Sequence, residues 1–361
     1  MAAHVPAKWV PVRRQEHAPT GAALRRLAGL TFALLLAAPA LAQAPGDLGW
    51  CGNDAGGSPA LQIKDCTRVI QSGKATPANL ILALTVRGRA YLAIGDQADA
   101  LKDLDTAIAA DPRNSAALLL RGGVHSARRE FDLAIADYDA ALKLDPKLAV
   151  AASDRGLTYA NKGDLTRAIA DYTLAIQIDP GLAAAFYNRG NARAAKSDAR
   201  GALVDFSEAI RLNPSYVNAY IRRANAETTI GGYAGAIADY AEAIKLAPGD
   251  PTAWVGRCWA RAIAGELPAG LADCNEMVKL RQSDPYALVI RGFARLKAGQ
   301  LDGAIADYTA VLRKEPKNAS ALYGRGTAEL KKKNARGSAD VSAAKAIKPD
   351  IAEEFERYGV R

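Results

Sequence analysis

Arginine recurs at eight positions spaced 34 residues apart, and this spacing constrains the fold of the chain more than any other feature. The eight positions are Arg87, Arg121, Arg155, Arg189, Arg223, Arg257, Arg291 and Arg325. An aspartate follows each arginine at a nearly constant distance, as Asp171 follows Arg155. A regular repeat of this length indicates an elongated array in which each unit packs against its neighbours.

Length and composition agree with an array of helices. At 361 residues the chain exceeds the size at which one globular core is usual, and the regular period favours an array over unrelated domains. Apolar residues make up 50% of the chain, and most of them are alanine and leucine. Aromatic residues make up only 6%. This composition favours closely packed helices over strands. We therefore expect an all-α fold.

Each unit has the pattern of a helix hairpin. In the unit that starts at residue 149, small and apolar residues form two stripes at spacings of three and four, separated by the polar turn 161–164. Gly163 can end the first helix in the left-handed conformation, and Asp164 can cap the second. Pro180 then ends the second helix. The units start at residues 81, 115, 149, 183, 217, 251, 285 and 319.

The pattern within a unit resembles the tetratricopeptide repeat family. That family has glycine at position 8, alanine at 20, an aromatic residue at 24, alanine at 27 and proline at 32. The unit at 149 has Gly156, Ala168, Tyr172, Ala175 and Pro180 at these positions. The resemblance covers residues 81–349 and implies a right-handed α-solenoid of about eight helix-turn-helix repeats with terminal caps, of the kind found in exported bacterial multi-repeat proteins.

The first 42 residues have the features of an export signal. Basic residues, among them Arg25 and Arg26, precede an apolar run that ends in Ala40-Leu41-Ala42. We expect cleavage after Ala42, and the two arginines leave general secretion and twin-arginine export both open. The apolar run is short for a membrane span, so we expect no stable membrane insertion after cleavage. The mature protein is then periplasmic or secreted.

The regions that flank the array are predicted to close its ends. Residues 43–80 begin with a stretch rich in glycine and proline and continue into a segment that matches a second repeat helix, so we expect a linker and a degenerate half-repeat. Residues 350–361 begin with Asp350 and include Gly359, which predicts a C-terminal helix that covers apolar surface of the last hairpin.

The four cysteines form two sets with similar spacing. In an antiparallel hairpin that turns near position 15, positions whose numbers sum to about 31 face each other. Cys258 and Cys274 lie at positions 8 and 24, so a disulfide is geometrically possible, and Cys51 and Cys66 have the equivalent relation. Export favours disulfides, and buried free thiols are the alternative. No CxxC spacing points to a metal or redox site.

The repeated arginines and aspartates predict a ladder of structural ion pairs. Positions 7 and 23 lie at the same height of each hairpin, so we expect Arg155 near Asp171 and Arg189 near Asp205, within or between neighbouring units. Since all units share these residues, a structural role is favoured over ligand binding. The balance of paired charges also argues against a one-sided basic patch, so we expect no nucleic-acid partner.

Residues that could support catalysis are few. Beyond the expected signal His125 is the single histidine, and no catalytic triad, metal cluster or phosphate loop stands out from the repeat pattern. We therefore expect no enzymatic activity and no metal or cofactor.

The resemblance implies that ligands bind in a concave groove lined by positions 2, 5, 6, 9, 12 and 13 of each first helix. Amide, arginine and aromatic side chains at or near these positions are candidates for binding a protein or peptide. The candidates are Tyr187, Asn188, Asn191, Asn218, Ile221, Arg222, Asn225, Trp259 and Phe293. We expect a scaffold or adaptor with a partner of unknown identity. The alternatives are a cell-envelope polymer or small ligand held by groove aromatics, and ordinary variation of a solvated surface.

Overall fold

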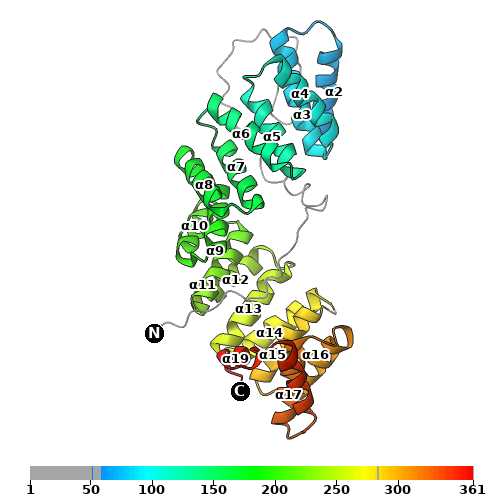
Figure 1. Cartoon of the computed structure of the whole chain (residues 1–361), viewed down its shortest axis with the longest axis vertical. Helices are drawn as coiled ribbons and strands as arrows, with labels where there is room; N and C mark the ends of the chain where they lie inside the picture. Colours follow the sequence, from blue (N-terminus) through cyan, green and yellow to red (C-terminus); the bar gives the residue numbers. More distant parts are fainter. Residues whose placement is uncertain (1–50, 52–57, 283, 361) are drawn as a thin grey trace. The chain divides into compact units, whose positions relative to one another are not determined.

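A computed structural model describes residue 51, residues 58–282 and residues 284–360. The expected export signal lies outside these residues. The described part of the chain contains helices and no strand (Figure 1). The helices are α2 (Pro59–Gln71), α3 (Pro77–Ile94), α4 (Gln97–Ala110), α5 (Ser115–Ala127), α6 (Phe131–Leu144), α7 (Ala149–Lys162), α8 (Leu165–Ile178), α9 (Ala183–Ala195), α10 (Ala199–Leu212), α11 (Val217–Thr229), α12 (Tyr233–Leu246), α13 (Pro251–Ala264), α14 (Leu267–Leu280), α15 (Pro285–Lys297), α16 (Leu301–Lys314), α17 (Ala319–Lys331), α18 (Gly337–Ile347) and α19 (Ile351–Arg357).

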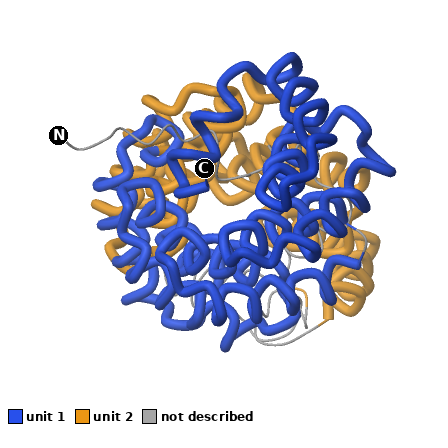
Figure 2. The backbone as a smooth tube through the Cα atoms, turned by 90° about the horizontal axis from the view of Figure 1, so that it is seen from below, with its two compact units in different colours: residues 1–10, 193–361 blue, residues 11–192 orange. Residues whose placement is uncertain are grey.

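Consecutive helices pair from α3 to α8 and from α11 to α18, and the predicted all-α solenoid is confirmed. In each hairpin the odd-numbered helix is the first helix of a repeat and the even-numbered helix is the second. The helix α2 packs against α3 ahead of the first hairpin. The described residues divide into two compact units, one of residues 51 and 58–192 and one of residues 193–282 and 284–360 (Figure 2). We call them the N-terminal unit and the C-terminal unit.

The turns within the hairpins follow from their sequence. Gly163 ends α7 with φ of 90°, a conformation that is open to glycine because it has no Cβ. Asp164 then caps α8, where its side chain accepts a hydrogen bond from the backbone N–H of Arg167. Gly95 and Asp96 make the same arrangement between α3 and α4. Glycine followed by aspartate therefore sets both the end of one helix and the start of the next.

Within a hairpin a small residue faces a large one. A Cβ on Gly122 of α5 would lie 2.8 Å from the ring of Tyr138 on α6, and a Cβ on Gly292 of α15 would lie 2.9 Å from the ring of Tyr308 on α16. Both tyrosines are buried. The glycine at position 8 thus lets the aromatic residue at position 24 fill the space between the two helices, at the dense packing of protein interiors.

The last hairpin has a turn one residue shorter than the other hairpins, and its two helix backbones approach each other closely. Its arginine and aspartate, Arg325 and Asp340, are 15 residues apart where the other pairs are 16 apart. Position 20 of this repeat is Gly337, and a Cβ there would lie 2.3 Å from the backbone oxygen of Gly326. Backbone meets backbone at this point, so neither glycine can carry a side chain without moving α17 away from α18.

We expect the substitution Gly337→Ala to lower the free energy of unfolding by about 2 kcal/mol, because overpacking of this kind typically costs about 1–3 kcal/mol. The loss should appear although alanine is intrinsically the better helix former. Urea denaturation followed by circular dichroism measures it. The matched control is Gly123→Ala in α5, where the new Cβ would meet only the Tyr138 hydroxyl at 3.8 Å. Equal stability of the two variants would contradict the close contact.

Candidate binding surfaces on the first helices

In seven of the eight repeats the arginine at position 7 is bound to the recurrent aspartate on the second helix of the same hairpin. Arg155 of α7 donates to Asp171 of α8 from Nε at 2.8 Å and from Nη2 at 2.7 Å. Asp171 is buried, and its hydrogen bonds raise the pKa of Arg155. The same two-point contact joins Arg87 to Asp103, Arg121 to Asp137, Arg223 to Asp239, Arg257 to Asp273, Arg291 to Asp307 and Arg325 to Asp340.

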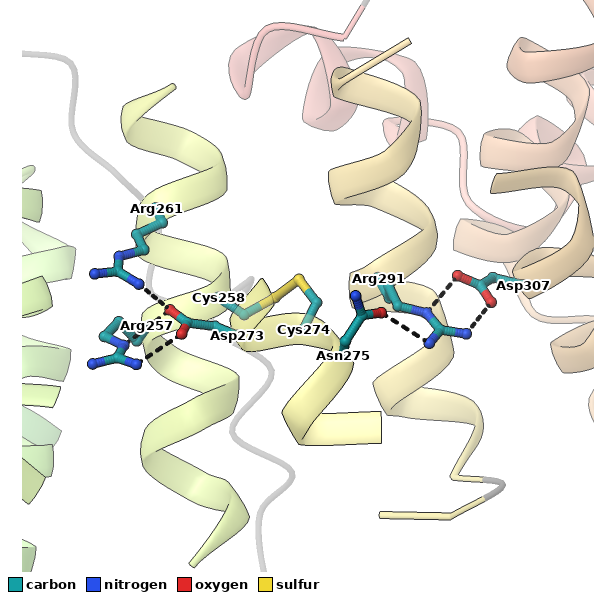
Figure 3. Close-up of a disulfide and its surroundings, with 8 residues drawn as sticks. All are labelled: Arg257, Cys258, Arg261, Asp273, Cys274, Asn275, Arg291 and Asp307. Carbon is teal, nitrogen blue, oxygen red and sulfur yellow. Dashed lines mark hydrogen bonds and ion pairs between the residues drawn. A yellow bond between two sulfur atoms is a disulfide. The ribbon is translucent and has the colours of Figure 1, made fainter. Parts of the chain in front are cut away.

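The remaining nitrogen of the same arginine links neighbouring repeats. Nη1 of Arg121 donates to Asp105 of the preceding hairpin at 2.8 Å, and Nη1 of Arg223 donates to Ser207 at 3.1 Å. Arg291 makes the equivalent contact with Asn275 (Figure 3). The ion pairs therefore stabilise the array both within and between repeats, and these guanidinium groups are already occupied.

The second expected pair falls at the boundary of the two compact units. In the N-terminal unit Arg189 donates to Thr173 at 3.0 Å. In the C-terminal unit Asp205 accepts from Arg193 at 2.9 Å. A direct pair between Arg189 and Asp205 stays a prediction.

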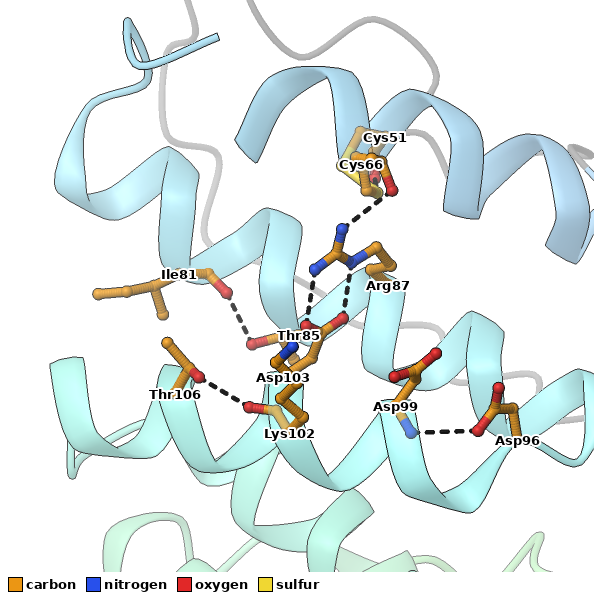
Figure 4. A network of polar contacts seen from close by, with 11 residues as sticks. Cys51, Cys66, Ile81, Thr85, Arg87, Asp96, Asp99, Lys102, Asp103 and Thr106 are labelled. Atoms are coloured by element: carbon orange, nitrogen blue, oxygen red, sulfur yellow. Dashed lines mark hydrogen bonds and ion pairs between the residues drawn. A yellow bond between two sulfur atoms is a disulfide. The ribbon is translucent and has the colours of Figure 1, made fainter. Parts of the chain in front are cut away.

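Both cysteine pairs form disulfides, as the spacing indicated. Cys258 of α13 is joined to Cys274 of α14 with a Cα–Cα distance of 5.1 Å (Figure 3). Cys51 is joined to Cys66 of α2 with a Cα–Cα distance of 4.8 Å, next to the Arg87–Asp103 pair (Figure 4). All four cysteines are buried. The disulfides hold one hairpin in the C-terminal unit and tie residue 51 to the first helix of the N-terminal unit.

Polar side chains of α9 remain open at the surface of the N-terminal unit. Asn188 and Asn191 are partly exposed, and neither amide side chain makes a hydrogen bond with the described residues. Tyr187 is partly exposed beside them. We call Asn188 and Asn191 the α9 amide pair. An open amide offers a donor and an acceptor, the combination that pairs with a peptide backbone.

The candidates on α11 in the C-terminal unit divide into two groups. Asn218 and Arg222 are exposed and one helical turn apart, so they share a face, which we call the α11 polar pair. Asn225 instead accepts a hydrogen bond of 2.6 Å from the hydroxyl of Tyr240 on α12. Ile221 is buried in an apolar cluster with Tyr240. Of the four candidates that the sequence analysis placed on this helix, Asn218 and Arg222 are exposed to solvent.

Trp259 and Phe293 are covered by the C-terminal helix. The Trp259 side chain is 5% exposed and that of Phe293 is 1% exposed. The ring of Tyr358 lies 5.1 Å from Trp259, and that of Phe355 lies 5.6 Å from Phe293, measured between centroids. With α19 in this position, these two predicted groove residues do not line an open surface.

One candidate residue was missed in the sequence. Asp154 of α7 occupies position 6 of its repeat, the position of Asn188 and Arg222 in later repeats. Desolvation by burial raises the pKa of Asp154 to about 7, and its carboxylate makes no hydrogen bond or ion pair with the described residues. Its negative charge also contributes to the raised pKa of the buried Tyr138. A comparison of position 6 along the repeats would have found it.

The described residues contain no group of three or more histidine, cysteine or acidic side chains that could hold a metal ion. Within the same residues, no helix combines the length and the apolar character needed to cross a membrane.

The histidine that the sequence singled out, His125, lies at the turn between α5 and α6. Its Nδ1 is 2.6 Å from a carboxylate oxygen of Glu130.

The hairpins, their glycine and aromatic positions and the ladder of ion pairs define a helical repeat protein of the class that serves as protein-interaction scaffolds. A family model described as tetratricopeptide repeat matches residues 85–149, 187–251, 222–285 and 291–350, and a model described as TPR repeat matches residues 156–197. The chain therefore belongs to the tetratricopeptide repeat family.

Several solved structures are similar to parts of the chain. The structure of pilF from Pseudomonas aeruginosa is 18% identical, covers 56% of this chain and 93% of its own, and has a TM-score of 0.52, which shows a shared fold. A tetratricopeptide repeat protein from Parabacteroides merdae is 20% identical over 68% of this chain and 97% of its own, with a TM-score of 0.49. MamA is 25% identical over 45% of this chain and 94% of its own, with a TM-score of 0.43. No curated protein matches the chain.

Proposed function

We propose that the protein is a non-catalytic scaffold that binds a peptide or protein segment along its first helices. The observation that carries the proposal is the contrast between shared and variable polar residues. The arginines and aspartates shared by the repeats bind one another, whereas the α9 amide pair and the α11 polar pair have open side chains. Specific binding then depends on residues that differ between repeats.

The chemistry of the open side chains fits a polypeptide partner. Asn188 and Asn191 can each donate to a backbone carbonyl and accept from a backbone N–H. Arg222 can donate to a carbonyl or a carboxylate. The carboxylate of Asp154 adds an acceptor on the N-terminal unit that has no partner among the described residues. Each unit thus has its own polar surface for a peptide.

We place this function outside the cytoplasm, in the periplasm or the cell exterior. The two disulfides support this location, since disulfides persist in oxidising compartments and are rare in the cytosol. The basic and apolar N-terminal 42 residues support it as well. Binding of an envelope polymer by stacking on Trp259 is the less favoured function, because Tyr358 at the end of α19 packs on that ring and leaves it buried.

Crosslinking in the native host, followed by mass spectrometry of the purified complex, identifies the partner. Its dissociation constant is then measured for the wild type and for two double variants, Asn188→Ala/Asn191→Ala and Asn218→Ala/Arg222→Ala. We expect each double variant to bind about 10-fold more weakly or worse, because each lost hydrogen bond contributes about 1 kcal/mol. Testing the two pairs separately shows which unit makes the contact.

The matched control is Glu208→Ala/Arg211→Ala on α10, a second helix, where the two side chains form a partly exposed ion pair. This control should bind like the wild type. Unchanged affinity of both double variants would contradict the proposal. Recovery of the protein on purified sacculi, with no second protein present, would favour the envelope polymer instead.

A further inference from the structure

The C-terminal helix α19 is amphipathic, with its apolar face turned into the C-terminal unit. Ile351 and Phe355 of α19, and Tyr358 that follows its last residue, lie at spacings of four and three and are buried. Glu353 and Arg357 on the other face are exposed. The helix has only seven residues, so it depends on packing for its stability.

The surface that receives α19 is built from the first helices of three successive repeats. Phe355 lies 5.6 Å from Phe293 of α15 and 4.7 Å from Tyr323 of α17, between ring centroids. Tyr358 lies 5.1 Å from Trp259 of α13. Figure 1 shows α19 beside α13 and α15. We call Trp259, Phe293 and Tyr323 the aromatic cradle.

The cradle is particular to these repeats. Trp259 and Phe293 both occupy position 9, and the other repeats have no aromatic residue there. The residues at position 9 of the other repeats are Arg89, Gly123, Leu157, Asn191, Asn225 and Thr327. At two of the three repeats against which α19 packs, an aromatic ring therefore takes the place of the non-aromatic residues found at position 9 in the other repeats. The cradle has the features of a site for an apolar helix.

The docked position of α19 carries unfavourable contacts. Glu354 is 7% exposed, and although Oε1 forms an ion pair with Lys348, the buried Oε2 has no hydrogen-bond partner in the described structure. A buried carboxylate oxygen without a partner opposes burial. Near Gly359, burial also lowers the pKa of Lys297, whose Nζ donates to the backbone oxygen of Ile263. The aromatic rings of this segment therefore stabilise its docked position, whereas the buried carboxylate of Glu354 destabilises it.

We propose that the aromatic cradle is a binding site for a short amphipathic helix of a partner protein, and that α19 occupies this site as a tethered competitor. The partner helix presents aliphatic or aromatic residues at the spacing of Ile351, Phe355 and Tyr358, with an uncharged residue in place of Glu354. The inference rests on the proposed function for the existence of a protein partner and adds the chemistry of that partner. The cradle is separate from the α9 amide pair and the α11 polar pair.

A labelled synthetic peptide of residues 346–361 is the probe, added to the full chain. The double variant Phe355→Ala/Tyr358→Ala removes the rings that hold α19 in the cradle. We expect this variant to bind the peptide at least 10-fold more tightly than the wild type does, because the tethered helix competes at an effective concentration on the order of millimolar. A peptide with Glu354→Gln should bind more tightly than the native peptide.

Two controls assign the binding to the cradle. The variant Glu353→Ala/Arg357→Ala changes only the exposed face of α19, so it should bind the peptide as weakly as the wild type. Adding Trp259→Ala to the Phe355→Ala/Tyr358→Ala variant should reduce peptide binding by at least 10-fold. Circular dichroism verifies that each variant keeps its helix content.

Hydrogen exchange of the wild-type chain tests the proposal without any substitution. The amides of residues 351–357 should exchange at least 10-fold faster than those of α15, because α19 opens while the repeats stay folded. Exchange as slow as that of α15, or a folded double variant that does not bind the peptide, would show that α19 is a permanent cap. Dimers in which α19 of one chain occupies the cradle of another would show that the occupant is a second copy of this chain, and would overturn the proposal. Unchanged partner affinity of the α9 and α11 double variants would contradict the proposed function and leave this peptide result intact, so the two proposals can be told apart.

Discussion

The substitution Asp307→Ala is expected to lower the free energy of unfolding by about 3 kcal/mol, the cost of removing one partner from a buried ion pair. Asp307 of α16 is 4% exposed and accepts hydrogen bonds from two arginines of α15. Arg291 donates to both of its oxygens, and Arg295 donates from Nη1 at 2.8 Å. Removal of the carboxylate leaves two guanidinium groups close together without a counter-charge.

The matched control for this prediction is Asp302→Ala in the same helix. Asp302 forms an ion pair with Lys332, but its side chain is 85% exposed. Exposed pairs contribute about 0–1 kcal/mol, so the free energy of unfolding of this variant should be close to that of the wild type. Urea denaturation measures both variants. An equal loss for the two aspartates would show that the ladder does not depend on burial.

Removal of the disulfide in the C-terminal unit should have a similar effect. We expect the double variant Cys258→Ala/Cys274→Ala to be about 3 kcal/mol less stable, because the bond closes a loop of 16 residues and restricts the unfolded chain. Denaturation of this variant and of the oxidised wild type gives the difference. Reduction of the wild type should lower its stability in the same direction.

Thiol titration provides the control for the disulfide prediction. The oxidised protein, unfolded without reductant, should show no reactive thiols, and the reduced protein should show those of all four cysteines. Four reactive thiols in the unreduced protein would contradict both bonds. A loss of stability well below 1 kcal/mol in the alanine variant would show that the bond adds little to the close packing of α13 and α14.

The sequence predicted the fold and the contacts within one hairpin because these depend on short spacings. The turn at Gly163 and Asp164, the pair of Arg155 with Asp171 and the bond of Cys258 with Cys274 each follow from positions inside one repeat. Two antiparallel helices joined by a short turn leave few possible registers. Position numbers therefore predict which side chains face each other.

The state of the candidate site was not predictable in the same way. Trp259 and Phe293 have groove positions in their repeats, but the segment that covers them lies more than one repeat further along the chain. No spacing rule relates α19 to α13. Asn225 is similar, since its bond to Tyr240 depends on side-chain conformation and not on the position of the residue alone. The sequence predicted which helix faces carry the candidates, and the structure shows which candidates are open.

The bridges between repeats are not uniform along the C-terminal unit. Arg223 and Arg291 each reach a polar side chain of the preceding hairpin, but Ala241 stands at the equivalent place before Arg257 and offers no such acceptor. Here Tyr240 instead packs against Gly256, where a Cβ would lie 2.2 Å from its ring. Tyr308 packs against Gly324 in the same way at the junction between α16 and α17, where a Cβ would lie 2.3 Å from the ring. Kosmotropic salts such as sulfate strengthen apolar contacts. These two joints of the C-terminal unit should therefore gain strength in concentrated sulfate, because ring packing contributes to both.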